Sequence, residues 1–152
     1  MTGKDLCEAS PDSEAIRRAI SRYAKAWVDG DRQGLVACYH DDFTLHYFGN
    51  NPLAGVHPGK AAALSILAEV TRHTNRKLVR IVDMMVGAER GGLLVREMFE
   101  RGGGTVEVER LLIYPVRDGL LWHCWVYDQQ QTLIDGILAA GGPFDPPGEA
   151  AR

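Results

Sequence analysis

The chain has 152 residues, 45% of them hydrophobic, and a formal net charge of −3 at pH 7. This length suits one domain with a single core, and the weak negative charge, without any lysine- or arginine-rich run, argues against nucleic-acid binding. The sequence has no apolar run of membrane-spanning length and its N-terminal residues lack the apolar core of a signal peptide, so we expect a cytoplasmic protein that does not bind membranes.

The first helix is predicted from its start signal and its apolar spacing. Ser10-Pro11 places a capping hydroxyl before a proline at the first helical position. Apolar residues then recur at helical spacing to about Asp29, and this pattern puts Tyr23 and Trp27 on the buried face. Residues 1–9 before this helix are expected to form a flexible arm.

Two more helices and one strand are predicted before the middle of the chain. Asp31 can cap a short helix that continues through Tyr39, and the alternating segment 44–48 (TLHYF) predicts a strand. Residues 49–59 are dense in glycine, asparagine and proline and are expected to form a loop. The pattern is helical again from residue 60 to about residue 73.

The second half predicts an antiparallel meander. From Lys77 onward the hydrophobic period becomes two, and glycine-rich turns separate four strand-like runs. A helical run at 132–139 can close the domain, and the glycine- and proline-rich residues 141–152 are expected to form a disordered tail. Helices followed by a curved, mainly antiparallel sheet make an α+β domain over residues 10–140, with the helices covering one face of the sheet.

The last predicted strand, within residues 118–130, ends in a carboxylate. Alternation puts four residues on one face, Trp122, Cys124, Val126 and Asp128, and four on the other, Leu121, His123, Trp125 and Tyr127. Both faces are largely apolar. An acid is unusual on a strand that is covered on both sides, so Asp128 lies either at a solvated strand end or in a pocket that uses it.

No cofactor or metal is expected. Cys7, Cys38 and Cys124 are an odd set without CxxC spacing, which fits neither a disulfide framework nor a zinc site, and we interpret them as reduced thiols. His46 and His123 lack paired metal-ligand spacing. No nucleotide-binding motif is present.

Several short motifs of the first half are informative together: YAKAWVDGD at 23–31, then Leu35 and Tyr39, DDF at 41–43 and NPLAG at 51–55. With the order of helices and strands, they resemble the SnoaL-like branch of the nuclear transport factor 2-like superfamily over roughly Glu14 to Leu138. The resemblance implies a cone-shaped barrel of helices and sheet around an internal cavity, and commonly a homodimer. It leaves the activity open, because this fold serves isomerases, cyclases, epoxide hydrolases, dehydratases and binding proteins.

Steroid isomerases of this superfamily supply one comparison of site residues. Their first helix carries an oxyanion-binding tyrosine eight residues before the aspartate of a Gly-Asp pair, and Tyr23 with Asp31 matches this spacing. The position of their general base is occupied by Tyr47, and their second acid falls in 111–113, which contains no acid. The resemblance therefore argues against a steroid-type proton shuttle at those positions.

Two other groups of relatives place an aspartate where Asp128 lies. SnoaL-type polyketide cyclases use this aspartate as an acid-base group. Limonene-type epoxide hydrolases combine it with an Arg-x-Asp pair on a neighbouring strand, and the matching positions here are Arg96 and Met98. Because Met98 is not an acid, the water-activating relay of these enzymes would be incomplete, which disfavours an epoxide hydrolase.

We therefore predict a cofactor-independent acid-base enzyme, of isomerase, cyclase or dehydratase type, that acts on a hydrophobic small molecule. Asp128 is the predicted general acid-base, and Tyr23, Tyr47 and Arg96 are predicted to position the substrate oxygen. The predicted substrate-binding residues of the cavity are Trp27, Met98, Trp122 and Cys124.

The alternative is a non-catalytic binding protein with the same cavity. In that reading Tyr23 and Tyr47 are packing residues with satisfied hydroxyls, and Asp128 caps the final helix or faces solvent. Arg96 is then a surface residue paired with a glutamate across the hairpin. We expect a homodimer through the outer sheet face that carries His123, Trp125 and Tyr127.

Overall fold

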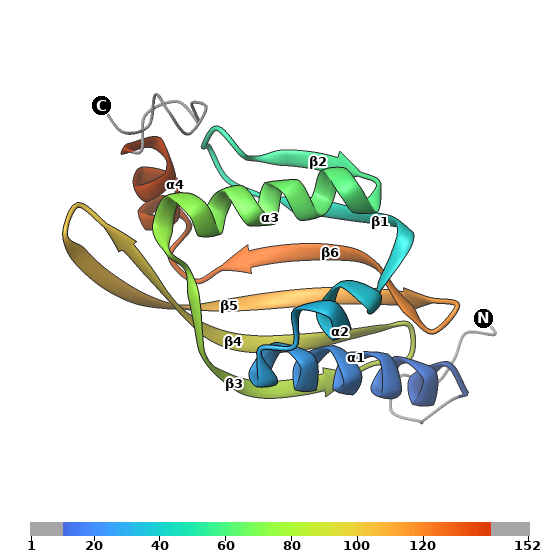
Figure 1. The fold of residues 1–152 in the computed structure, drawn as a ribbon. Coiled ribbons are helices and arrows are strands. Elements are labelled where there is room, and N and C mark those ends of the chain that lie inside the picture. The colour runs from blue at the N-terminus through green and yellow to red at the C-terminus, as the bar shows by residue number, and fades with distance from the viewer. Residues whose placement is uncertain (1–10, 141–152) are drawn as a thin grey trace, which may run out of the picture.

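The computed structural model describes residues 11–140, and in this range four helices and six strands form an α+β domain (Figure 1). In chain order they are α1 (Pro11–Asp29), α2 (Arg32–Ala37), β1 (Tyr39–Tyr47), β2 (Gly55–Pro58), α3 (Lys60–Thr74), β3 (Lys77–Val86), β4 (Arg90–Arg101), β5 (Gly104–Arg117), β6 (Leu120–Asp128) and α4 (Gln131–Ala140). The predicted arm at 1–9 and tail at 141–152 lie outside the described residues. No helix in the described range is long and apolar enough to cross a membrane.

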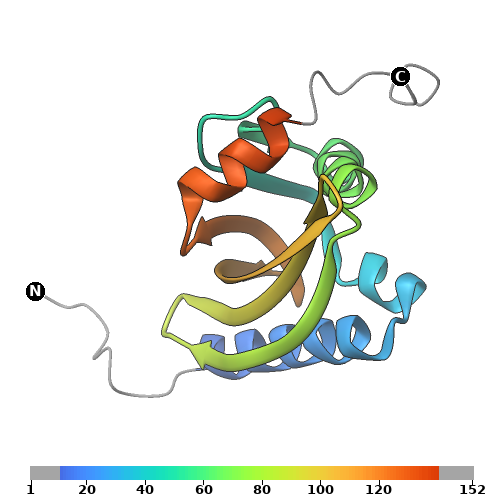
Figure 2. The same ribbon diagram turned by 90° about the vertical axis from the view of Figure 1, so that its left-hand side faces the viewer.

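One curved sheet contains all six strands, in the order β2-β1-β6-β5-β4-β3 (Figure 2). The meander from β3 to β6 is antiparallel throughout, as predicted, whereas β1 pairs with β6 in parallel. Because β2 and β3 are free edges, the sheet is open. The helices and the curved sheet are present as predicted, but the sheet does not close into a barrel.

Helices α1, α2 and α3 cover one face of this sheet (Figures 1 and 2). The apolar stripe of α1 is buried there, with Ile16, Ile20 and Tyr23 at most 5% exposed. Close approach of α1 to β4 depends on Gly91, because a Cβ atom at this position would lie 2.7 Å from the Ile16 side chain. The three predicted N-terminal helices are therefore confirmed, and they leave the space between helices and sheet for a cavity.

Local signals located most helix boundaries well, but they missed the end of α2 and the second strand. Asp31 caps α2 as predicted, with its carboxylate accepting a hydrogen bond from the Gly34 amide. However, α2 ends at Ala37, and Tyr39 begins β1 instead of continuing the helix. The predicted loop at 49–59 contains β2, a short edge strand that ends in Pro58, where a missing N–H costs no hydrogen bond within the sheet.

Candidate functional site

A cavity of about 430 Å³ lies between the helices and the sheet. Side chains of α1, α2, α3, β1, β4, β5 and β6 line it, and most of these side chains are aliphatic or aromatic. Two of the predicted substrate-binding residues, Trp27 and Cys124, are among them. A cavity of this size and polarity is typical of a small-molecule site.

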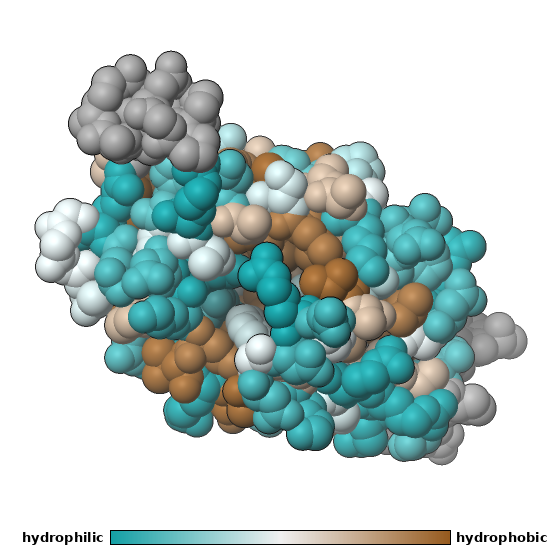
Figure 3. All heavy atoms as spheres, in the orientation of Figure 1, coloured by the Kyte–Doolittle hydropathy of each residue, from teal (hydrophilic) through white to brown (hydrophobic). Residues whose placement is uncertain are grey.

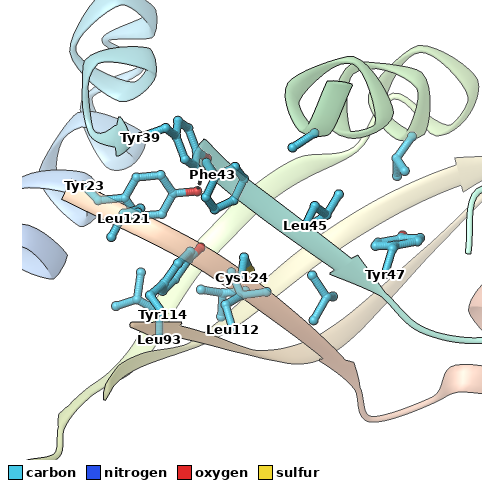
Figure 4. Close-up of a cluster of buried hydrophobic side chains, with 14 of the residues drawn as sticks. Tyr23, Tyr39, Phe43, Leu45, Tyr47, Leu93, Leu112, Tyr114, Leu121 and Cys124 are labelled. Carbon is cyan, nitrogen blue, oxygen red and sulfur yellow. Dashed lines mark hydrogen bonds between the residues drawn. The ribbon is translucent and has the colours of Figure 1, made fainter. Parts of the chain in front are cut away.

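Three tyrosines form one hydrogen-bonded cluster in the cavity wall. The Tyr39 hydroxyl donates to the Tyr23 oxygen at 2.9 Å, and Tyr114 is a second hydrogen-bond partner of Tyr23. Figure 4 shows the Tyr23 and Tyr114 hydroxyls facing one another, with the Tyr39 ring above them. The Tyr23 ring centroid lies 5.5 Å from that of Tyr39 and 5.3 Å from that of Tyr114, in edge-to-face geometry.

All three hydroxyls are neutral donors at physiological pH. Burial raises the pKa of Tyr23 to about 12, although the hydrogen bonds from Tyr114 and Tyr39 oppose part of this shift. Burial also raises the pKa of Tyr39 and of Tyr114 well above the ordinary tyrosine value. The neighbouring Cys124 thiol has its pKa raised to about 12, again mainly by burial, so it is not a thiolate nucleophile.

A buried ionic network lies farther along the sheet, centred on Arg110. Its Nε donates to Asp128 Oδ1 at 2.6 Å and its Nη2 to Asp128 Oδ2 at 3.2 Å, while its Nη1 donates to Glu97 Oε2 at 3.1 Å. Nη2 also donates to the Tyr47 hydroxyl at 2.9 Å. The Arg110, Glu97 and Asp128 side chains are only 1–2% exposed.

Strand register brings this network together. Arg110 of β5 is directly opposite Asp128 of β6 and opposite Val95 of β4, and Glu97 is two residues farther along β4 on the same face. Burial lowers the pKa of Arg110, whereas the neighbouring Glu97 and Asp128 raise it. The raising effects are larger in sum, so the pKa lies well above the ordinary arginine value and the guanidinium stays charged. Arg76 extends the network, since its Nε lies 3.6 Å from Glu97 Oε1.

The predicted acid-base residue is buried in this network. Glu97 and Arg110 line the cavity, whereas Asp128 and Tyr47 do not and contact Arg110 instead. Figure 4 shows Tyr47 near the end of β1, away from the tyrosine cluster. Asp128 neither caps α4 nor faces solvent, and the carboxylate in the cavity wall is that of Glu97.

Three further predicted site residues, besides Asp128 and Tyr47, do not line the cavity. Arg96 and Met98 are on the face of β4 opposite to Glu97, and Arg96 is 38% exposed and bound to Glu107 at 2.8 Å and to Glu109 at 3.4 Å. Trp122 is displaced because the pairing of β5 with β6 shifts by one residue between Val116 and Ile113, so strict alternation fails there. Its ring centroid lies 4.9 Å from the Arg117 guanidinium carbon.

Sequence reasoning missed the other polar members of the tyrosine cluster and of the ionic network that line the cavity: Tyr39, Arg76, Glu97, Arg110 and Tyr114. A signal for two of them was present. Glu97 alternates with Val95 and Phe99, and Arg110 alternates with Val108 and Leu112, so each charge interrupts an apolar strand face. The other three depend on packing between distant segments.

The opposite sheet face carries an aromatic stack formed by His46, His123 and Trp125. His46 Nε2 lies 2.9 Å from His123 Nδ1, and the His46 and Trp125 rings are nearly parallel with centroids 4.3 Å apart. The Arg90 guanidinium lies 4.6 Å from the Trp125 ring centroid. Among residues 11–140, no group of three or more histidine, cysteine, aspartate or glutamate side chains is arranged to hold a metal ion.

An open, curved sheet covered by three helices around a mainly apolar cavity is a fold of the nuclear transport factor 2-like class. A family model for the SnoaL-like domain matches residues 20–124. The chain belongs to the SnoaL-like family, as its sequence motifs indicated. No curated protein matches the sequence significantly.

Solved structures share this fold at low sequence identity. Bal32a from a soil-derived mobile gene cassette is 19% identical with a TM-score of 0.74, covering 84% of this chain and 98% of its own. A putative SnoaL-like polyketide cyclase from Jannaschia sp. CCS1 is 15% identical with a TM-score of 0.67, covering 95% and 100%. RV0760c from Mycobacterium tuberculosis, in complex with estradiol-17beta-hemisuccinate, is 19% identical with a TM-score of 0.59, covering 74% and 92%.

Proposed function

We propose that this protein is a cofactor-independent acid-base enzyme that isomerises, cyclises or dehydrates an apolar small molecule. One observation carries the proposal: a hydrogen-bonded tyrosine and an arginine-bound carboxylate, Tyr23 and Glu97, line the same mainly apolar cavity. The family match and the polyketide cyclase-like fold relatives support a small molecule as the substrate.

Tyr23 is the proposed donor to the substrate oxygen. Its oxygen has Tyr39 and Tyr114 as hydrogen-bond partners, and when both donate, its own proton is directed to a ligand in the cavity. A ketone oxygen that gains negative charge in an enolate-like transition state would accept this hydrogen bond. In a site that excludes water, such a preorganised donor increases the reaction rate by a factor of about 10²–10³.

Glu97 is the proposed proton-transfer carboxylate, in place of the predicted Asp128. It lines the cavity, and Arg76 and Arg110 fix its two oxygens from different sides. Asp128 becomes a positioning residue in this proposal, because its bidentate contact orients Arg110. Tyr47 orients the same guanidinium.

Proton exchange tests this proposal before the natural substrate is known. The protein is incubated with a panel of apolar ketones in D₂O, and deuterium incorporation next to the carbonyl is followed by NMR. We expect incorporation with at least one bound ketone, its loss in Glu97→Gln with binding retained, and a loss of about 10²–10³ in Tyr23→Phe. Arg96→Gln, on the other sheet face, is the control and should exchange normally. Ketones that bind without any exchange or turnover would contradict the proposal.

An epoxide hydrolase is a second candidate. Met98 leaves the expected relay without its second acid, yet the structure brings together an acid-arginine-acid set from other positions: Glu97, Arg110 and Asp128. Hydrolysis of apolar epoxides in ¹⁸O-labelled water tests this reading, with the label expected in the diol. Absence of diol formation across the panel would remove it.

The alternative is a non-catalytic binding protein. It is favoured by the ionic network around Arg110, in which the charged groups already have partners. Each acid of the network, Glu97 and Asp128, already has an arginine partner. This reading expects ligand binding that is unchanged in Glu97→Gln, and no proton exchange for any bound ligand.

A further inference from the structure

The cavity opens between α2 and α3. The lining residues with exposed side chains are Arg32 and Val36 of α2 and Ala68, Thr71 and Arg72 of α3. Lining residues from α1 and the strands are buried or half-buried. Figure 3 shows hydrophobic side chains in the gap between α3 and α2, with hydrophilic side chains around them.

Helical spacing directs the two mouth arginines toward the opening. Arg32 is three residues before Leu35 and four before Val36, and all three line the cavity from one face of α2. Arg72 is four residues after Ala68 on α3, and both line the cavity. The two arginines therefore come to the mouth from different helices, Arg32 from α2 and Arg72 from α3.

The arginines of the cavity outnumber the acids that neutralise them. Arg76 and Arg110 are engaged in the buried network with Glu97 and Asp128. At the mouth, Arg72 pairs with Glu69, which also contacts His73. Arg32 makes no side-chain hydrogen bond or ion pair within residues 11–140. One positive charge of the described lining thus remains at the entrance of this mainly apolar cavity.

We infer that the ligand of this cavity is an apolar molecule with a carboxylate, which Arg32 and Arg72 bind at the mouth while the apolar part fills the interior. This inference rests on the proposed function, because it names the class of its substrate. A guanidinium presents its N–H groups in a fork that matches the two oxygens of a carboxylate. The single negative charge of the carboxylate also balances the positive charge of Arg32.

A matched pair of fluorescent probes tests the inference: anthracene carboxylate and the neutral anthracene carboxamide, which has nearly the same shape. Fluorescence titration of the full chain is expected to give about tenfold tighter binding of the carboxylate at low salt. High salt should reduce this preference, because the mouth is solvent-exposed.

Three variants test whether the preference for the carboxylate probe arises from the arginines at the cavity mouth. Arg32→Gln with Arg72→Gln is expected to remove the carboxylate preference and to leave carboxamide affinity unchanged. Glu69→Gln releases Arg72 from its ion pair and is expected to strengthen carboxylate binding about threefold. Arg18→Gln removes the same charge from an exposed position of α1 outside the cavity and should change neither affinity.

The outcomes separate this inference from the proposed function. Equal affinity for both probes in the unmodified protein overturns the carboxylate class, while the apolar cavity and its chemistry stand. A preference that persists in the double variant also overturns the assignment to Arg32 and Arg72. Binding of neither probe contradicts the proposed function together with this inference.

Discussion

Replacing Arg110 by methionine is expected to lower the free energy of unfolding by about 3–5 kcal/mol at neutral pH. The side chain is 1% exposed, and the substitution removes its hydrogen bonds to Asp128, Glu97 and Tyr47. Two carboxylates would remain buried at 2% exposure, with only Arg76, at 3.6 Å from Glu97, as a cation. The penalty comes from these uncompensated charges more than from the lost contacts.

Urea unfolding followed by tryptophan fluorescence and circular dichroism measures the effect. A loss of about 3–5 kcal/mol corresponds to a fall in Tm of roughly 6–20 °C for a domain of this size. Adding Glu97→Gln and Asp128→Asn to Arg110→Met should restore much of the stability, because it removes the buried charges. Replacing a whole buried ionic set by uncharged residues is often nearly neutral.

Arg96→Met is the matched control. Arg96 is on the neighbouring strand and also contacts two carboxylates, but its side chain is 38% exposed, so its loss should cost less than about 1 kcal/mol. Equal effects of Arg110→Met and Arg96→Met would refute the argument that burial decides the cost. The argument also fails if the triple variant is as unstable as Arg110→Met alone.

Three further predictions concern packing, protonation and thiol reactivity. Gly91→Ala should destabilise the protein by about 1–3 kcal/mol in urea unfolding because its methyl would overlap two isoleucines of α1, whereas Gly136→Ala, with free space in α4, should stabilise it by roughly 0.5–1 kcal/mol. Equal effects would contradict this packing. Burial lowers the pKa of both His46 and His123; the adjacent His123 lowers the pKa of His46 further, and the Arg90 guanidinium lowers that of His123 further. The unfolded chain therefore binds these protons more readily, and Tm should fall as the pH drops below about 6.5. A double replacement of the two histidines by phenylalanine should flatten this part of the Tm profile, and an unchanged slope would refute the assignment. Burial, which raises the pKa of Cys124 to about 12, should keep this thiol unalkylated by iodoacetamide until the protein unfolds, as mass spectrometry would show. Modification of Cys124 in the native protein would contradict its burial.

The helices of this protein were predictable because their signals are local. The cap at Asp31 and the apolar spacing through Ile16, Ile20 and Tyr23 depend only on neighbouring residues. Periodicity also predicted the antiparallel meander. It missed β2, because an edge strand needs only one partner and tolerates the glycine and proline that otherwise indicate a loop.

The candidate site was predictable only in part, because alternation assigns a strand face but not a partner. The sequence by itself determined the SnoaL-like fold and the buried face of α1 that carries Tyr23 and Trp27, but it left open whether Asp128 lies in a pocket or at a solvated strand end. Only the tertiary structure decided that Arg110 faces Asp128, because that contact depends on the register between β5 and β6. The tertiary structure also decided that Glu97 lines the cavity, whereas Asp128 contacts Arg110 instead.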